Sequence, residues 1–287
     1  MQPVIATPTR SPSRRGWILR IALIVIVGGY IAWFLGHYLL QELAIFPGAY
    51  LPAEARPLRD APPASVQSIW LTMADGTRVE AWYRPGRNRT ASNPGPAVMY
   101  FHGNLDTIDN RWEWVEWHID HGAALLAMEY RGYGRLAGKP SQQALTSDAV
   151  AFHDWLVAQP EVRSDQIILR GLSLGGGVAV ALAEQRRPAA LVLECTFASI
   201  AALAQQRWLP AALCRHPFRS DRVLPTLGVP VLMLHGKTDE VIPIEHARRM
   251  ARRTPTAEFI ELDCGHSSFR ADPQTIAAFL RRHALLE

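Results

Sequence analysis

Residues 166–185 read QIILRGLSLGGGVAVALAEQ, and from them the fold class can be inferred. The stretch opens with a short apolar run typical of a buried strand and ends in a sequence with helical character. The turn between them, GLSLG (171–175), is a G-x-S-x-G motif in the strand–turn–helix setting that the motif requires. Glycine at both flanking positions lets strand and helix approach closely. The stretch therefore predicts that Ser173 is a nucleophile at the carboxyl end of a strand; the structural alternative is a glycine-rich helix start capped by serine.

The alternation of strand and helix extends outward from this turn in both directions. Continuous apolar runs are typical of strands buried on both faces, and their alternation with helices indicates a mostly parallel sheet covered on both sides. VQSIWLT and RVEAWYR precede it and flank Asp75-Gly76, a hairpin signal. We therefore predict an α/β fold. The expected strands are 97–101, 123–130, 166–171, 190–195, 231–236 and 257–262, with helices near 109–121, 141–159, 174–187, 244–253 and 272–284.

A serine hydroxyl is a weak nucleophile unless a base, held by a third group, activates it. Asp239 lies five residues beyond the apolar core of the run 231–234, and His266 follows the run 257–262. Because the carboxyl ends of parallel strands meet at one edge of a sheet, we expect Ser173, Asp239 and His266 to form a catalytic triad there. Three other acids near strand ends are rivals to Asp239: Glu240, Asp263 and Glu194.

Acyl transfer at such a serine also needs two N–H donors for the developing oxyanion. One is expected to be the backbone N–H of Leu174, the residue after the nucleophile. The other is expected from the loop after strand 97–101, which reads HGNL. Glycine in that loop lets the backbone come close, and the N–H of Asn104 or Leu105 is the candidate donor.

The composition makes several other classes of protein poor fits. With 48% hydrophobic and 20% charged residues the chain is globular, and its net charge of +4 is spread over the N-terminus and paired arginines on expected helices. Since no basic stripe is interleaved with aromatic residues, no nucleic-acid partner is expected. The three cysteines, Cys195, Cys214 and Cys264, match no zinc spacing, so neither a metal nor a cofactor is expected.

Residues 21–40, IALIVIVGGYIAWFLGHYLL, predict a single transmembrane anchor. Twenty residues at about 1.5 Å each span roughly 30 Å, the thickness of the hydrocarbon layer. The basic tail, residues 1–20, is expected in the cytoplasm by the positive-inside rule, with the catalytic domain on the opposite side, the periplasm in a bacterium. A cleaved signal peptide and a buried core helix are the alternatives. Residues 41–65 are interpreted as a connector and residues 66–287 as the catalytic domain.

The stretch 196–229 breaks the alternation of strands and helices and is interpreted as a possible small cap. Its apolar side chains either line a groove for an acyl chain or merely pack onto the sheet. As candidate substrate-binding residues we single out Trp208, Leu209 and Phe218.

With these residues placed, the chain resembles the α/β-hydrolase family, and within it the single-pass branch of Bem46-like, ABHD13-like and ABHD17-like serine hydrolases. The resemblance covers roughly residues 38–284. It departs after the HGN motif, where members often continue with Ala-Gly-Asn and this chain has LDT (105–107). It rests on LAIFP (43–47), HGN (102–104), RGYG (131–134), GLSLGG (171–176), LE (193–194) with Phe197 and Ser199, HGKTDEVIP (235–243) and CGHSSF (264–269).

The resemblance implies an α/β-hydrolase fold and a Ser173–Asp239–His266 triad that acts on esters, thioesters or lipids. We therefore expect a membrane-anchored serine hydrolase that cleaves carboxylic ester or thioester bonds of an amphipathic or lipid-like substrate through an acyl-enzyme. Two alternatives stay open: a serine peptidase or aminopeptidase-like hydrolase, and a non-catalytic membrane-anchored scaffold with the same fold.

Overall fold

The computed structural model describes residues 14–52, 58–59, 61–206 and 210–286. The chain divides into two compact units, one up to Gln41 and one from Glu42 onward, which is called the sheet unit below. Helix α1 (Arg14–Ile45) supplies the described part of the first unit and the first four residues of the sheet unit. It is 32 residues long, and by length and composition it could cross a membrane. None of its most apolar 18 residues is buried. The predicted anchor lies entirely inside it.

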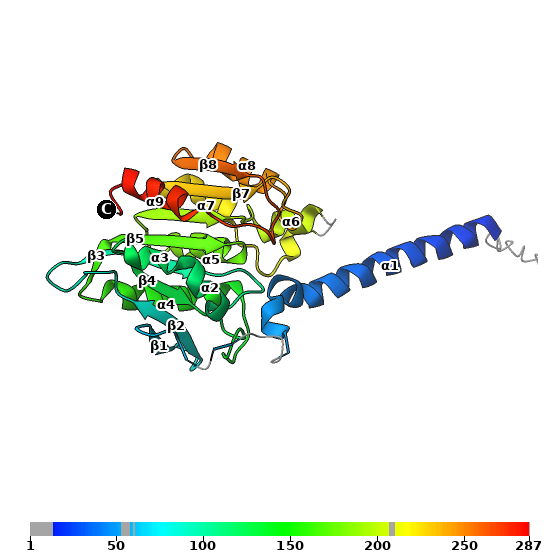
Figure 1. The fold of residues 1–287 in the computed structure, drawn as a ribbon. Coiled ribbons are helices and arrows are strands. Elements are labelled where there is room, and N and C mark those ends of the chain that lie inside the picture. The colour runs from blue at the N-terminus through cyan, green and yellow to red at the C-terminus, as the bar shows by residue number, and fades with distance from the viewer. Residues whose placement is uncertain (1–13, 53–57, 60, 207–209, 287) are drawn as a thin grey trace, which may run out of the picture. The chain divides into compact units, whose positions relative to one another are not determined.

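The sheet unit is built on an eight-stranded sheet with the order β1-β2-β4-β3-β5-β6-β7-β8. The pairs β1–β2 and β2–β4 are antiparallel, and the strands from β4 to β8 along the sheet run parallel, as predicted. Figure 1 shows β1 at one end of the sheet and β8 at the other. The strands are β1 (Gln67–Thr72), β2 (Arg78–Arg84), β3 (Gly95–Phe101), β4 (Ala124–Met128), β5 (Val162–Leu172), β6 (Ala190–Glu194), β7 (Val231–Gly236) and β8 (Ala257–Leu262).

Helices cover both faces of the sheet and close two hydrophobic layers (Figure 1). Alternate residues of β3 show the division, because Val98 and Tyr100 belong to one layer and Met99 and Phe101 to the other. One layer is closed by α2 (Ile108–Val115), α3 (Trp117–Asp120) and α9 (Pro273–Arg282), and the other by α4 (Gln142–Val157), α5 (Leu174–Ala183), α7 (Ser220–Leu227) and α8 (Glu245–Arg253).

Several elements differ from the sequence prediction at their boundaries, and two of them are described here. The helix predicted near 109–121 is divided at Glu116 into α2 and α3, although the Glu116 N–H still donates to Trp112 O. Strand β5 begins at Val162, four residues before the predicted run, because its first residues include the polar stretch 163–165, which carries no apolar signal.

The stretch predicted as a cap leaves the sheet after β6. It contains α6 (Ile200–Gln206), the short 3₁₀ helix η3 (Ala211–Leu213) and α7. Helix α7 packs against α5 and α8, so it belongs to the main helical layer rather than to a separate lid. Helix α6 comes soon after the carboxyl end of β6, at the edge where the parallel strands end.

Candidate active site

Ser173 occupies a strained turn between β5 and α5. Its backbone has φ 53° and ψ −115°, a combination that residues with a side chain rarely adopt and that persists only where the surroundings enforce it. Glycine is required on both sides: a Cβ on Gly171 would collide with the backbone of Gly175, and one on Gly175 with the carbonyl of Phe101. The turn is fixed from β6, because Ser173 N–H donates to Glu194 O (2.8 Å) and Thr196 Oγ donates to Ser173 O (2.7 Å).

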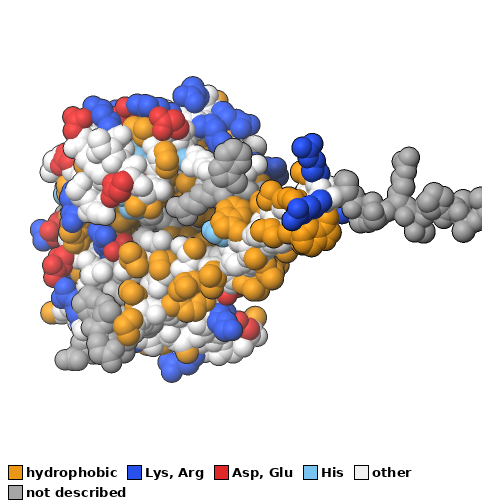
Figure 2. All heavy atoms as spheres, turned by 90° about the vertical axis from the view of Figure 1, so that its right-hand side faces the viewer, with side chains coloured by type: hydrophobic (Ala, Val, Ile, Leu, Met, Phe, Trp, Pro, Cys, Tyr) orange, Lys and Arg blue, Asp and Glu red, His pale blue; other side chains and the backbone are white. Residues whose placement is uncertain are grey.

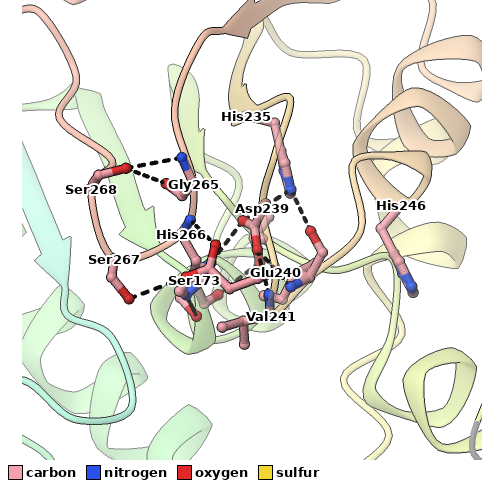
Figure 3. A network of polar contacts seen from close by, with 12 residues as sticks. Ser173, His235, Asp239, Glu240, Val241, His246, Gly265, His266, Ser267 and Ser268 are labelled. Carbon is pink, nitrogen blue, oxygen red and sulfur yellow. Dashed lines mark hydrogen bonds and ion pairs between the residues drawn. The ribbon is translucent and has the colours of Figure 1, made fainter.

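The structure brings the three predicted triad side chains together at the carboxyl edge of the sheet. His266 Nε2 lies 3.1 Å from Ser173 Oγ, and His266 Nδ1 lies 2.7 Å from Asp239 Oδ2 (Figure 3). The serine and the aspartate are buried, whereas the imidazole is partly open to solvent. A serine hydroxyl, an imidazole and a carboxylate in this chain of hydrogen bonds form the geometry that general-base activation of serine needs.

Asp239 is held as an ionised acceptor. Its Oδ1 accepts the N–H groups of Val241 (2.9 Å) and Ile242 (2.7 Å), while its Oδ2 faces His266 and, at 3.3 Å, His235 Nε2. Burial alone would raise the pKa of Asp239, but the hydrogen bonds from His235, His266 and Ile242 outweigh it and hold this pKa well below its usual range. A carboxylate so held keeps the Nδ1–H of His266 pointed inward and leaves Nε2 toward the serine.

Glu240, the rival acid next to Asp239, has a different position. Its Oε2 accepts the backbone N–H of His266 (3.0 Å), and its Oε1 accepts Ser267 Oγ (3.3 Å) (Figure 3). A Cβ on Gly265 would lie 2.6 Å from the same carboxylate. Glu240 therefore holds the backbone of the histidine loop, and its carboxylate does not bond to the imidazole ring.

The other two rival acids are engaged elsewhere. Glu194 is buried in a bidentate ion pair with Arg170 (2.9 and 3.1 Å). Asp263 is exposed and pairs with Lys237 (2.8 Å). Neither carboxylate faces His266, which leaves Asp239 as its acidic partner.

The loop predicted to supply the second oxyanion donor lies beside the serine. A Cβ built on Gly103 would stand 3.8 Å from Ser173 Cβ. The Gly103 N–H is already used, because it donates to Asp106 Oδ2 (3.1 Å), and Asp106 in turn pairs with Arg111 (2.8 Å). Within the described part of the chain no acceptor is assigned to the N–H of Asn104 or Leu105.

On the nucleophile's side, Leu174 is the first residue of α5, so its N–H has no partner inside the helix. The arrangement leaves the three predicted N–H groups, those of Leu174, Asn104 and Leu105, available to an oxyanion at Ser173.

A buried pair behind this loop was not identified from the sequence. His102 Nε2 lies 2.7 Å from Glu129 Oε1, and His102 Nδ1 lies 2.8 Å from Gly103 O. Glu129 Oε2 also accepts the N–H of Ile108 (3.2 Å), the first residue of α2. The His102 ring therefore bridges the Glu129 carboxylate and the Gly103 carbonyl, and it ties the loop between β3 and α2 to the end of β4. The only sequence signal was the histidine of the HGN motif.

The predicted substrate-binding residues are placed only in part. Trp208 and Leu209 lie outside the described residues. Phe218 is buried, and its ring packs edge-on against Phe197 with the centroids 6.2 Å apart. Its N–H donates to Gln142 Oε1 (2.8 Å). In this structure Phe218 is therefore part of the core beneath the loop at 214–219 and not the wall of an open groove.

Among the residues that the structure describes, Cys195 joins Asp239 and His266 in a group of three side chains with metal-binding atoms. Its sulfur, the Asp239 carboxylate and a ring nitrogen of His266 all lie within 4.8 Å of one another. The thiol is buried, and burial raises its pKa. Since Asp239 and His266 bond directly to each other at 2.7 Å, no space for an ion separates them, and the group is better suited to proton transfer than to metal binding.

Known proteins with a similar sequence include members of the α/β-hydrolase superfamily. A profile of the serine aminopeptidase S33 family matches residues 92–220. The protein Rv2307c of Mycobacterium tuberculosis is 32% identical over 262 residues, which cover 89% of both chains. The α/β-hydrolase domain-containing protein WAV2 of Arabidopsis thaliana is 30% identical and covers 69% of this chain and 71% of its own. The rat lysophosphatidylserine lipase ABHD12 is 28% identical and covers 72% of this chain and 56% of its own.

Solved structures show the same architecture at low sequence identity. A thermophilic esterase of Thermogutta terrifontis, solved with butyrate bound, superimposes with a TM-score of 0.66 at 16% identity, over 80% of this chain and 98% of its own. An esterase of Pyrococcus furiosus superimposes with a TM-score of 0.62 at 18% identity, over 80% of this chain and 96% of its own. At such identities the likeness concerns the fold alone.

Proposed function

Because the chain belongs to the α/β-hydrolase superfamily, we propose that it is a serine hydrolase that cleaves carboxylic ester or thioester bonds. The observation that supports this most strongly is the continuous hydrogen-bonded line from Ser173 Oγ through His266 to Asp239, with steps of 3.1 and 2.7 Å. The strained backbone at Ser173 supports it further, because such strain is maintained where the side chain must be presented to a ligand.

In the proposed reaction His266 Nε2 takes the proton from Ser173 Oγ as that oxygen attacks the substrate carbonyl carbon. The carbonyl oxygen becomes an oxyanion, which the N–H of Leu174 and that of Asn104 or Leu105 stabilise. The imidazolium gives its proton to the departing alcohol or thiol and leaves an acyl-enzyme. Water, deprotonated by the same imidazole, then releases the acid and restores the serine.

We propose further that the substrate is amphipathic or lipid-like. Two observations support this: helix α1 is apolar and long enough to hold the enzyme at a membrane, and one relative is named for its action on lysophosphatidylserine. In this proposal the chain has the organisation of the single-pass Bem46-like, ABHD13-like and ABHD17-like branch. Residues 1–20 lie in the cytoplasm, and the sheet unit lies on the opposite side of the membrane.

A second candidate, an aminopeptidase-like activity, is favoured by the name of the family whose profile matches residues 92–220. The two candidates differ in the bond that is cleaved. We would compare hydrolysis of p-nitrophenyl butyrate with that of amino-acid p-nitroanilides, using the purified full chain in detergent. The proposal predicts turnover of the ester and little or none of the anilides. Turnover of the anilides alone would favour the peptidase, and absence of both activities would favour a non-catalytic scaffold.

A further inference from the structure

Four exposed apolar side chains belong to segments that adjoin the active-site loops in sequence or by contact. Leu105 follows the oxyanion-loop residue Asn104, Val241 lies two residues after Asp239, and Tyr50 and Leu213 come from η1 (Pro47–Tyr50) and η3. Their exposed fractions are 59%, 50%, 48% and 42%. Large hydrophobic residues so exposed, when gathered around one site, mark an interaction surface. Figure 2 looks onto the right-hand side of Figure 1 and shows that many of the side chains along helix α1 are hydrophobic.

We propose that these four residues, called the apolar rim, lie in the surface of the bilayer that holds α1, so that substrate reaches Ser173 from the membrane and not from water. The inference rests on the proposed function and adds the surface through which the substrate enters. It also changes the interpretation of residues 42–50, from a passive connector to a part of the active-site edge.

The chain that follows the anchor is fixed to the oxyanion loop. Phe46 is fully buried, and Gly48 N–H donates to Asn104 O (3.0 Å). A Cβ on Gly48 would lie 2.8 Å from that same carbonyl oxygen and would collide with the ring of Tyr133. The point where the chain enters the sheet unit is therefore held against the active-site edge.

The same segment is also fixed to the loop before α7. Glu42 pairs with Arg215 (2.6 Å), and the ring of Phe46 packs edge-on against His216 with the centroids 5.3 Å apart. Leu213 of the rim lies two residues before that arginine. The segment 42–50 thus contacts both the oxyanion loop and the neighbouring loop, and two rim residues, Tyr50 and Leu213, lie next to these contacts.

The remaining length of chain is too short to place this edge far from the membrane. If the anchor ends at Leu40, as its sequence predicts, only residues 41–45 separate it from the buried Phe46, and all five are helical. Five or six helical residues cover about 9 Å. The headgroup layer on one side of a bilayer is roughly 5–8 Å thick. By chain length alone, Phe46 is tethered within about 9 Å of the predicted end of the anchor, a distance comparable with one headgroup layer.

The bilayer suits the rim better than a second protein does, because it needs no matched surface. The rim side chains come from separate loops, and Tyr50 has the amphipathic ring that favours the membrane interface. A substrate with an acyl chain in the bilayer can then present its carbonyl to Ser173 while most of the chain stays in lipid.

The test places a fluorescent probe on the rim of the full chain, reconstituted in phosphatidylcholine vesicles. An environment-sensitive NBD group is attached to a single new cysteine, introduced as Leu213→Cys or as Val241→Cys. Both variants also carry Cys214→Ser and Cys264→Ser, so that these partly exposed thiols are not labelled, and Cys195 is kept because it is buried. Trp70→Cys is the matched control, because Trp70 is similarly exposed, at 39%, but lies in the middle of edge strand β1.

The proposal predicts a blue-shifted emission at positions 213 and 241, quenched by lipids with spin labels at headgroup depth, and a water-like, unquenched emission at position 70. Water-like emission at all three positions would overturn the membrane-facing rim. Hydrolysis of a water-soluble ester is measured on the same samples. If it persists while the rim probes stay in water, only the rim proposal fails; if it is absent while the probes are quenched, the proposed function fails and the rim stands.

A comparison of hydrolysis rates on two kinds of substrate gives a second test of the apolar rim. Leu213→Ser should lower the ratio of the rate on a vesicle-borne ester to the rate on a soluble ester by about fivefold, the effect expected from losing part of a buried leucine side chain. Trp70→Ser should leave that ratio unchanged. Equal ratios for the two variants would count against the rim.

Discussion

His266 Nε2 and Ser173 Oγ lie 3.1 Å apart although 93 positions separate the two residues in the chain. The parallel sheet produces this proximity, because β5 and β8 end at the same edge and the loops that follow them converge there. The imidazole therefore has the serine proton on one side and Asp239 on the other.

We expect Ser173→Ala to lose ester hydrolysis by a factor of about 10⁴ or more, because no other group can form the acyl-enzyme. His266→Gln should be about as damaging, since glutamine cannot accept the hydroxyl proton. Initial rates with p-nitrophenyl butyrate measure both variants, and circular dichroism reports whether they remain folded. Folded variants that retained activity within tenfold of the wild type would contradict the assignment of the triad.

Substitutions of the adjacent acids Asp239 and Glu240 should differ sharply in their effect on kcat. Asp239→Asn should lower kcat about 10⁴-fold, because an amide that donates to the imidazole favours the wrong tautomer. Glu240→Gln should cost less than about tenfold, because the amide oxygen can still accept the backbone N–H of His266. Steady-state kinetics of the two variants side by side decide which acid faces the ring, and a reversed order would reassign the acid.

The sequence was sufficient for the fold and for the gathering of the triad residues. Each of Ser173, Asp239 and His266 follows an apolar run, and the carboxyl ends of parallel strands must share an edge, so a local pattern was enough to predict a long-range contact. The position of Glu240 was not predictable. Two neighbouring carboxylates in a loop are equivalent in sequence, and only the backbone course decides which one meets the ring.

The contacts of the oxyanion loop could not be predicted from the sequence either. Asp106 closes the loop by accepting the Gly103 N–H, a role that depends on the turn geometry. Gly48 bonds to Asn104 although more than fifty positions separate them in the chain, and no periodic pattern in the sequence predicts this contact. Phe218 appeared suitable for an exposed groove because apolar side chains in a cap and in a core have the same sequence signature.

Gly48→Ala should impair catalysis even though Gly48 is far from the triad in sequence. Its methyl group would press on the Asn104 carbonyl and the Tyr133 ring and displace the loop that supplies an oxyanion donor. Losing such a donor altogether costs about 10²–10³ in kcat, so we expect a fall of at least about tenfold with a smaller change in KM. Gly36→Ala in α1 is the matched control, because a Cβ there meets no described atom within 4 Å. Equal kcat values for the two variants would show that Gly48 does not position the loop.

Acid should destabilise the sheet unit partly through His246. Burial, with the nearby Arg249, lowers the pKa of His246 to about 4, and its Nδ1 accepts the Ala198 N–H (3.2 Å). In the unfolded chain this pKa is near 6.5. Between the two values the unfolded state binds a proton that the folded state does not, so the free energy of unfolding falls as the pH drops from about 6.5 to about 4.

One such proton contributes a slope of about 1.4 kcal/mol per pH unit within that window. His246→Gln should remove this contribution and flatten the pH dependence. Urea unfolding of both proteins in detergent at pH 7, 5.5 and 4.5 measures the difference, and the other buried histidines act equally in both. Parallel curves would mean that His246 is protonated in the folded state as readily as in the unfolded one.

The reaction of Ser173 with a fluorophosphonate tests whether the triad activates this serine. Such a reagent bonds covalently to a serine only where a base activates the hydroxyl and donors receive the phosphoryl oxygen, so it reports the assembled site without knowledge of the substrate. Peptide mass spectrometry of the labelled full chain should find the adduct on the peptide that contains GLSLG (171–175), and His266→Gln should abolish it. An unlabelled Ser173 in folded wild-type protein, or an adduct on another residue, would contradict the account.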